Sequence, residues 1–538
     1  MRRTADARSP RTVAVATSAA LAVALGAIAL AQAAPAHAAT SASVWVTTPD
    51  RGKLLAKQAD VTFGAGGSGS VITVDPATTY QSMVGFGASL TDAAASNIAS
   101  SPQRDQIMNA LFNPSTGIGL SWLRQPIGAS DFSRSFYTYD DGAADPTLSR
   151  FSIAHDLDQI IPLIKQARQL NPALTVMASP WSAPGWMKTN NALIGGSLQT
   201  TYNATYADYL VKFVQAYQAQ GVPVSYLSLQ NEPLYSPGGY PGMLMSSSQQ
   251  ADIVKLLAPK LTAAGLSTKI LAYDHNWDNT GYATDVLNNA GSSVVGSAWH
   301  CYAGDPSAQN AVRNAFPTKD IFFTECSGIE SGNTFADSLK WQGTNLAINA
   351  VRNWSRTVTT WNLALDANHG PVIGSCTNCT GVVTTSGGSY TTNAEYYVLG
   401  HLSTFVKPGA VRISSTGFGD GGVQNVAFRN TDGTIALVAL NTGGAAQDFK
   451  VSYQGTSFGY NLPAGAMATF TWAGTGTTPS TTPPTPTVTP TTTPTPTPTT
   501  TTPPTAGSCT VVSGSTYRIT SASSGKALDV RDNSTANG

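Results

Sequence analysis

Two glutamates stand where short apolar runs of the chain stop, and their carboxyl groups have the clearest chemical potential. The run Val224–Leu229 indicates a buried strand, and Glu232 follows it directly before Pro233, which cannot continue a central strand because it lacks an N–H group. The run Ile321–Thr324 has the same design and ends in Glu325. A lone glutamate before proline usually caps a turn. Two glutamates ending two buried strands instead match what hydrolysis of a sugar–sugar bond needs, a proton donor and a nucleophile.

Polar and aromatic residues also follow three earlier apolar runs. Asp92 could accept hydrogen bonds from two adjacent sugar hydroxyls, or it could cap a helix over residues 93–100. Arg124 could orient a catalytic carboxylate, close a buried ion pair, or do both. Trp181 lies in a rigid loop rich in proline and glycine, where an indole face suits stacking on a sugar ring better than core packing.

Three further residues complete the candidate site. His300 ends the sixth apolar run; no partners at metal-ligand spacing accompany it, so we expect it to form hydrogen bonds near the glutamates. Trp361, followed by Asn362, ends the eighth run and would form the floor of a sugar site. Asn231, next to Glu232, could bond the sugar 2-hydroxyl, a contact that strengthens in the transition state. Two carboxyl groups suffice for this chemistry, so we expect no metal and no organic cofactor.

These residues require a scaffold that brings many strand ends together. Apolar runs alternate with helical patterns between residues 80 and 402, which predicts an α/β catalytic domain, a (β/α)8 TIM barrel whose strand ends share one rim. An open doubly wound sheet is the alternative, but no glycine-rich phosphate loop follows the first strand. The expected strands are Met83–Phe86, Leu120–Arg124, Leu174–Ala178, Tyr226–Leu229, Lys269–Ala272, Val294–Ala298, Ile321–Thr324 and Val358–Asn362, and the expected helices are Pro102–Phe112, Ile153–Leu170, Tyr202–Gln220, Ser246–Ala264, Tyr282–Asn289, Ala308–Ala315 and Asp337–Asn353.

The segments on either side of the barrel are β-like. Residues 39–79 and 403–474 each hold short strands separated by turn residues, and together they would form one side β-sandwich beside the barrel. Residues 475–507 are rich in threonine and proline, which is typical of an extended linker. Residues 508–538 begin a new β unit that is too short for a stable core, so the chain looks like a fragment of a longer protein.

The first 38 residues have the pattern of a signal peptide, with a basic start, an apolar run and the small-residue cleavage site Ala36–Ala38. A membrane anchor is the weaker alternative. We therefore expect a secreted, extracellular protein with no membrane association after cleavage. The whole chain has 30 Lys+Arg and 30 Asp+Glu, and removing four arginines and one aspartate leaves a net charge of about −3. With no basic patch, a nucleic-acid partner is not expected.

The chain has five cysteines, and export permits disulfides. Cys376 and Cys379 favour a loop disulfide, because no second pair with zinc-ligand spacing accompanies them. Cys301 and Cys326 follow neighbouring strands and could be buried thiols or a bridge. Cys509 is left without a partner.

A set of motifs, in the same order along the chain from about residue 44 to 472, resembles glycoside hydrolase family 30, which includes glucosylceramidases and microbial endo-β-1,6-glucanases. The resemblance implies a retaining barrel fused to a side sandwich, with Glu232 as acid/base and Glu325 as nucleophile. It also implies that Asp92, Arg124, Trp181, Asn231, His300, Tyr302 and Trp361 line the −1 sugar site. The segment 508–538 resembles the start of a ricin-type β-trefoil carbohydrate-binding module. The motifs are Phe86–Asp92, Ser179–Thr189, Gln230–Pro233, Trp299–Tyr302, Thr324–Cys326 and Trp361–Leu365.

Four motifs are more similar to those of the microbial β-1,6-glucanases than to those of the ceramidases. The expected function is therefore secreted, retaining endo-β-1,6-glucan hydrolysis by double displacement, by a chain that acts as a monomer on a polysaccharide. The acid/base should have a raised pKa while the nucleophile stays ionised. The alternatives are a β-1,6-galactanase or glucosylceramidase-like enzyme, or a non-catalytic polysaccharide-binding protein. The motifs are Gln230–Leu234, Tyr273–Trp277, Trp299–Tyr302 and Phe323–Gly328.

Overall fold

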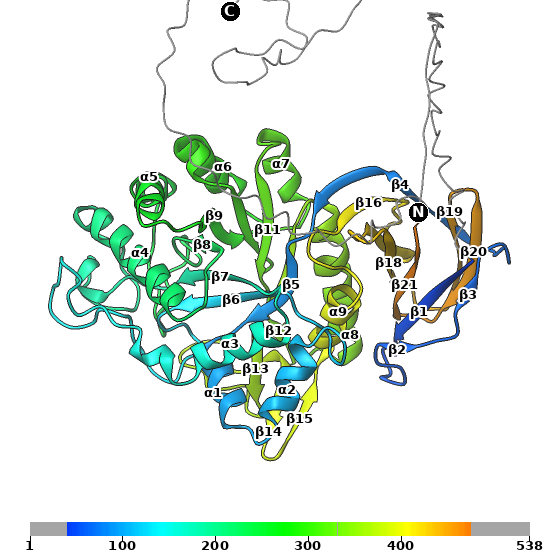
Figure 1. Ribbon diagram of the computed structural model, residues 1–538, viewed down its shortest axis with the longest axis horizontal. Helices are drawn as coiled ribbons and strands as arrows, with labels where there is room; N and C mark the ends of the chain where they lie inside the picture. The colour runs from blue at the N-terminus through cyan, green and yellow to red at the C-terminus, as the bar shows by residue number, and fades with distance from the viewer. Residues whose placement is uncertain (1–39, 331, 475–538) are drawn as a thin grey trace, which may run out of the picture. The chain divides into compact units, whose positions relative to one another are not determined.

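The computed structural model describes residues 40–330 and 332–474 (Figure 1). The expected signal peptide, linker and C-terminal module lie outside these residues. Within the described part of the chain, no helix is both long and apolar enough to cross a membrane.

A closed barrel of eight parallel strands forms most of the described chain, as the alternation of strands and helices predicted. The strands run in order around the barrel, and its seam joins the last two, where Ile321 pairs in parallel with Ser355. The hydroxyls of Thr357 and Thr359 also donate to the carbonyl of Phe323 across this seam, at 2.9 and 2.8 Å. The strands are β5 (Gly85–Ser89), β6 (Trp122–Ile127), β7 (Thr175–Pro180), β8 (Tyr226–Ser228), β9 (Lys269–Asn276), β10 (Gly296–His300), β11 (Asp320–Glu325) and β13 (Thr357–Asp366).

Helices surround the barrel and pack against one another around it (Figure 1). Thr91, not Asp92, caps the first helix, because its hydroxyl accepts the N–H of Ala94. The expected helix over 337–353 forms in two parts, an α-helical one that starts with a capping box at Thr334 and a π-helical one. The elements are α1 (Asp92–Ser100), α2 (Arg104–Phe112), α3 (Ile160–Leu170), α4 (Asn203–Ala219), α5 (Ser247–Ala263), α6 (Thr280–Ala290), α7 (Ala308–Ala315), α8 (Phe335–Gln342), η5 (Gly343–Ala350) and α9 (Ala394–Ser403).

The barrel interior is a packed core with a polar layer above it. Large apolar side chains, among them Trp122, Tyr226 and Phe322, pack together inside the lower part of the barrel. Above them the inward positions change to charged residues, beginning with Arg124, which is fully buried. The packed lower part closes the barrel from below and leaves its carboxyl-terminal rim as the place for chemistry.

Both ends of the described chain build one β-sandwich, as predicted. Strand β1 (Ser41–Thr47) pairs antiparallel with β21 (Met467–Ala473), while β4 (Ser70–Ser82) lies between β16 (Val411–Ser415) and β19 (Gln447–Tyr453). Helix α9 joins this sandwich to the barrel through His401, whose ring nitrogens each lie 2.9 Å from a threonine hydroxyl, those of Thr47 and Thr469. The remaining strands of the sandwich sheet are β2 (Ala56–Lys57), β3 (Val61–Thr62), β17 (Val423–Arg429), β18 (Thr434–Asn441) and β20 (Thr456–Leu462).

Candidate active site

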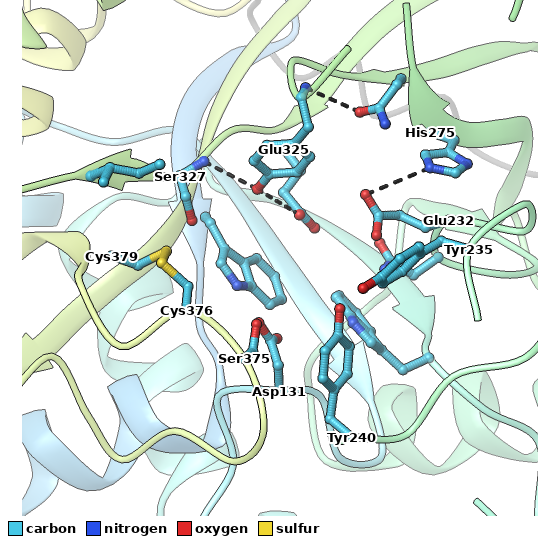
Figure 2. Close-up of a pocket in the computed structure, with 16 residues that line it drawn as sticks. Asp131, Glu232, Tyr235, Tyr240, His275, Glu325, Ser327, Ser375, Cys376 and Cys379 are labelled. Atoms are coloured by element: carbon cyan, nitrogen blue, oxygen red, sulfur yellow. Dashed lines mark hydrogen bonds and ion pairs between the residues drawn. A yellow bond between two sulfur atoms is a disulfide. The ribbon is translucent and has the colours of Figure 1, made fainter. Parts of the chain in front are cut away.

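The two glutamates identified from the sequence meet at the carboxyl-terminal rim of the barrel (Figure 2). Glu325 is the last residue of β11, and Glu232 lies in the loop after β8. One carboxylate oxygen of Glu232 lies within 4.8 Å of one of Glu325. Retaining glycosidases hold their carboxyl groups about 5–5.5 Å apart, whereas inverting ones leave about 6.5–9.5 Å for a water molecule. The spacing therefore fits direct attack by one carboxylate on the sugar.

The backbone of Glu232 is held in an unusual conformation. Its φ angle is 47°, in the left-handed region that non-glycine residues rarely occupy. Its N–H group donates to the carbonyl of Asp274 at 2.9 Å, which ties the loop after β8 to the end of β9. A strained backbone of this kind persists only where surrounding contacts stabilise it, and such residues are common at functional sites.

Two side-chain donors fix the carboxylate of Glu325. The guanidinium of Arg124 donates to Oε2, and the hydroxyl of Tyr302 donates to Oε1 at 2.9 Å. Arg124 also donates to the side-chain oxygen of Asn231 at 2.7 Å, so one cation orients residues on both sides of the site. Both roles considered for Arg124 hold, since it orients Glu325 and closes a buried ion pair with it.

Asp274 is the centre of this network and was not among the residues predicted from the sequence. It is fully buried, and although burial opposes ionisation, the charge of Arg124 and the hydrogen bond from His300 hold its pKa well below the usual range. Asp274 thus provides a permanent negative charge beneath the two glutamates. Its oxygens accept hydrogen bonds from Arg124 at 2.9 Å, His300 at 3.0 Å, Ser179 at 2.7 Å, Ser228 at 2.5 Å and Thr324 at 2.7 Å.

His300 lies between Asp274 and Glu232. Burial alone would lower its pKa, but the carboxylates of Glu325, Asp274 and Glu232 raise the pKa to about 9. At neutral pH the ring is therefore protonated, and its Nδ1 lies 3.3 Å from Oε1 of Glu232. The side chains of Glu232, His300 and Glu325 are close enough together to hold a metal ion. A protonated imidazole has no lone pair for a metal, which favours the hydrogen-bonding role expected for His300.

We expected a raised pKa for the acid/base Glu232 and an ionised nucleophile Glu325. In the free site, the two pKa shifts have the opposite directions. Burial would raise the pKa of Glu232, but the hydrogen bond from His300 and its charge bring that pKa below its ordinary value. Burial raises the pKa of Glu325, and the charge of Glu232 adds to this, against the opposing effect of His300 and Arg124. In the free site, the proton that an acid catalyst needs is therefore not yet on Glu232.

A pocket of about 340 Å³ opens above the glutamates. Two tryptophans predicted from the sequence, Trp181 and Trp361, stack on each other in its wall with ring centroids 4.9 Å apart. Asn231 and Tyr302 line the pocket as well, whereas Arg124 and His300 are not part of its lining but contact the lining residues Asn231 and Glu232. Residues not expected from the sequence also line it: Asp131, Tyr235, Tyr240, His275, Asn276, Ser327, Ile329, Ser375, Cys376 and Cys379.

The two aspartates near this site have different surroundings. Asp92 lies outside the pocket lining. Arg134 donates to both of its oxygens, and His155 approaches one of them at 2.9 Å. Asp131 instead lines the pocket with one oxygen that has no hydrogen-bond partner among the residues that the structure describes. Burial, together with the charges of Glu325 and Glu232, raises the pKa of Asp131 to about 7. Of these two aspartates, Asp131 rather than Asp92 lines the pocket.

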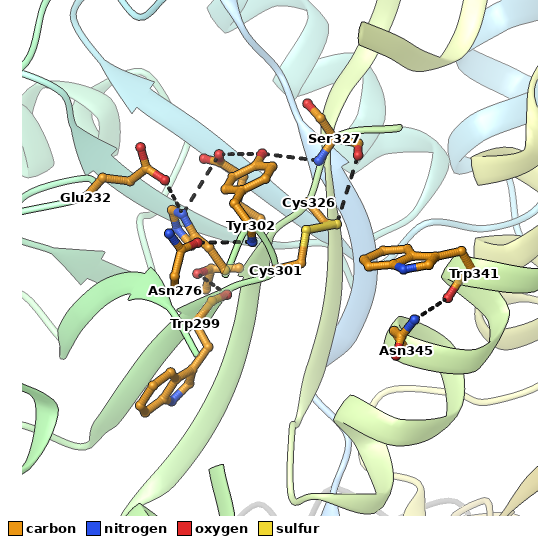
Figure 3. Close-up of a disulfide and its surroundings, with 12 residues drawn as sticks. Glu232, Asn276, Trp299, Cys301, Tyr302, Cys326, Ser327, Trp341 and Asn345 are labelled. Carbon is orange, nitrogen blue, oxygen red and sulfur yellow. Dashed lines mark hydrogen bonds and ion pairs between the residues drawn. A yellow bond between two sulfur atoms is a disulfide. The ribbon is translucent and has the colours of Figure 1, made fainter. Parts of the chain in front are cut away.

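Both candidate disulfides are formed beside the pocket. Cys376 is bonded to Cys379, as expected, and Cys301 is bonded to Cys326, which settles the alternative left open by the sequence. The second bond links the residues that directly follow β10 and β11 (Figure 3). It therefore connects the segments that carry Tyr302 and Glu325.

Comparison with known proteins adds an independent line of evidence. The model of the glycosyl hydrolase family 30 TIM-barrel domain matches residues 83–406, and that of the family 30 beta sandwich domain matches residues 409–470. An endo-1,6-beta-D-glucanase of Trichoderma harzianum is 38% identical over 72% of this chain and 84% of its own. The chain belongs to glycoside hydrolase family 30. Membership makes it a glycoside hydrolase with the barrel and side sandwich described above.

Other family 30 relatives differ in what their names say they act on. An endo-1,6-beta-D-glucanase of Aspergillus fumigatus is 36% identical over 83% of this chain and 97% of its own. A lysosomal acid glucosylceramidase of Mus musculus is 29% identical over 76% of this chain and 84% of its own. A solved endo-beta1,6-glucanase is 33% identical and superimposes with a TM-score of 0.76 over 80% of this chain and 99% of its own.

The Asp274–His300 contact predicts a change in pH dependence. In an Asp274→Asn variant the His300 ring loses an anionic partner, so its pKa should fall from about 9 toward the ordinary 6.5. We expect the alkaline limb of kcat/KM to move to lower pH and kcat to fall roughly 10- to 100-fold through misplacement of the site. Ser179→Ala removes one hydrogen bond to Asp274 and keeps its charge, so its alkaline limb should stay in place. An unchanged limb in Asp274→Asn would show that His300 does not control it.

Proposed function

We propose that the chain is a secreted, retaining endo-β-1,6-glucanase that cleaves β-1,6-glucan with Glu232 as acid/base and Glu325 as nucleophile. The observation that carries the proposal is the pair of carboxylates within 4.8 Å of each other beside a pocket walled by stacked tryptophans. The substrate is inferred from relatives 36–38% identical that are named endo-1,6-beta-D-glucanases. The two disulfides support export, because such bonds persist in oxidising surroundings.

In the first step Glu325 attacks the anomeric carbon from below while the glycosidic oxygen leaves. The bond from that carbon to the leaving oxygen breaks, and the oxygen takes a proton from Glu232, so the products are a glycosyl ester on Glu325 and a free hydroxyl on the departing sugar. Arg124 and Tyr302 hold the attacking carboxylate in one orientation, and Arg124 also orients Asn231, to which we assign the bond to the 2-hydroxyl.

In the second step Glu232 acts as a base. It takes a proton from a water molecule, whose oxygen attacks the anomeric carbon and displaces Glu325, so the original configuration returns. The protonated His300 beside Glu232 stabilises its ionised form between the two steps. Because Glu232 favours the ionised form in the free site, its proton has to be gained as the sugar binds and displaces water.

A product analysis tests the substrate and the mechanism together. The enzyme would be given linear β-1,6-glucan, β-1,6-galactan and glucosylceramide in parallel, with proton NMR following the anomer of the earliest product. We expect a ladder of gluco-oligosaccharides that appear first as β-anomers. Galacto-oligosaccharides or ceramide as the preferred product would change the substrate and keep the mechanism, and first-formed α-anomers would contradict retention. No turnover of any of the three would contradict the proposal and favour a polysaccharide-binding protein.

A further inference from the structure

A second hollow adjoins the catalytic pocket. It has a volume of about 290 Å³ and shares Tyr302, Ser327 and Ile329 with that pocket, so these three residues border both hollows. Figure 3 shows the Cys301–Cys326 disulfide between Tyr302 and Trp341, the residue that faces the disulfide from α8. Tyr302 therefore separates the catalytic pocket from a hollow on its other side.

The hollow has the chemical character of a sugar-binding surface. Trp341 is 44% exposed, and Tyr302 and Ile329 are exposed to a similar degree, so an indole face and apolar neighbours are open to solvent. Contiguous exposed apolar surface rimmed by polar groups usually marks a binding site. The polar rim includes Asn333 and Ser338, while Asp337 already bonds the cap residue Thr334.

A buried polar atom also borders the hollow without a partner. The side chain of Gln342 is almost fully buried, and its carbonyl oxygen Oε1 forms no hydrogen bond within the described chain. A third hollow, which extends to Asp420 and Thr442 of the sandwich, also includes Trp341 in its lining. Trp341 thus lines both the second and the third hollow.

We propose that Trp341 is the stacking platform of a distal subsite, which binds a sugar unit of the glucan chain outside the catalytic pocket. The proposal rests on the glucanase function above and adds a residue that selects for long substrates. A neutral glucan chain suits the hollow better than a charged ligand, because Asp337 is the one charged residue in its lining. Stacking on indole uses the apolar faces of a sugar ring and leaves its hydroxyls for the rim.

The test compares substrates of increasing length. Wild type and Trp341→Ala would be assayed as full chains on an aryl β-glucoside, on β-1,6-linked gluco-oligosaccharides from the disaccharide upward, and on the polysaccharide. We expect Trp341→Ala to match wild type on the aryl glucoside and to lose roughly 10-fold in kcat/KM on the long substrates, the scale of one lost binding contact. Trp341→Phe, which keeps an aromatic face, should recover most of that loss.

A matched control separates the subsite from general effects of losing an exposed ring. Phe136 is 38% exposed and borders neither hollow, so Phe136→Ala should equal wild type on every substrate. Equal activity of Trp341→Ala and wild type at all chain lengths would overturn the subsite and leave the glucanase function standing. An equal loss on the aryl glucoside and the polysaccharide would also overturn it. A wild type that cleaves no β-1,6-glucan would overturn both proposals.

Discussion

Replacing Glu325 with alanine should abolish hydrolysis of the glucan, with a loss of kcat on the order of 10⁵-fold or more, because no carboxylate remains to form the glycosyl–enzyme bond. The shortened side chain leaves space below the anomeric carbon, beside the donors Arg124 and Tyr302. Azide can occupy that space and attack an aryl β-glucoside that has a good leaving group. The rescued product should be the α-glucosyl azide, formed with one inversion.

Two further variants make this result specific. Glu325→Gln fills the same volume with a poor nucleophile, so azide should not restore its activity. Glu330 is an exposed glutamate nearby, and Glu330→Ala should retain wild-type turnover. NMR of the azide product gives the decisive reading, since a β-glucosyl azide from Glu325→Ala would assign the nucleophile to another residue.

The loss of the acid/base has a different signature. Glu232→Ala should reduce kcat on the polysaccharide by roughly 10²- to 10⁴-fold, the usual contribution of proton transfer. An aryl glucoside with a good leaving group needs no proton to depart, so its first step should stay fast and the glycosyl ester on Glu325 should accumulate. Azide can then attack that ester from the upper face, and the product should be the β-glucosyl azide.

Rapid-mixing kinetics and mass spectrometry check this second prediction. A burst of phenol release, followed by a slow steady state and a covalent adduct on Glu325, would agree with the assignment of Glu232. Loss of the burst would place the defect in the first step, which would contradict the role of Glu232 as the base of the second. The product configurations of the two alanine variants therefore distinguish the two carboxylates without reference to rate.

The sequence predicted the glutamates because each is visible as a break in a short apolar strand. Pro233 directly after Glu232, and the change from apolar to polar residues at Glu325, mark strand ends, and strand ends of a parallel barrel share one rim. The same reasoning located Trp181 and Trp361, which line the pocket. These residues depend on local pattern and on a topology that the alternation of strands and helices predicts.

Asp274 and Asp131 could not be found in this way. The expected strand ended at Ala272, but β9 continues to Asn276 with left-handed backbone at Tyr273 and Asp274, where φ is 74° and 70°. This irregularity turns Asp274 toward Arg124, and spacing alone does not reveal it. Asp131 lies in the loop after β6, and its place in the pocket depends on the course of that loop.

The contacts of Asp92 and the pKa shifts of Glu232 and Glu325 could not be predicted by considering one residue at a time. Asp92 follows its strand as expected, yet Arg134 comes from a separate loop and occupies its carboxylate. The pKa of Glu232 depends on His300, whose own charge depends on Glu325 and Asp274. Such effects arise from contacts between distant segments, which no local pattern encodes.

The pairing of β1 with β21 also has a consequence for how the protein is made. Ser43 lies opposite Thr471, so β1 leaves the ribosome, soon followed by its partners β2 and β3, but long before its partner β21 exists. Contacts this distant along the chain form slowly. Until β21 is synthesised, the edge of β1 that pairs with it stays unpaired, and unpaired strand edges are prone to aggregation. We expect the barrel to fold first and the sandwich to form last. A nascent chain that stops before β16 would then have a nearly complete barrel and an amino-terminal segment that lacks its sandwich partners.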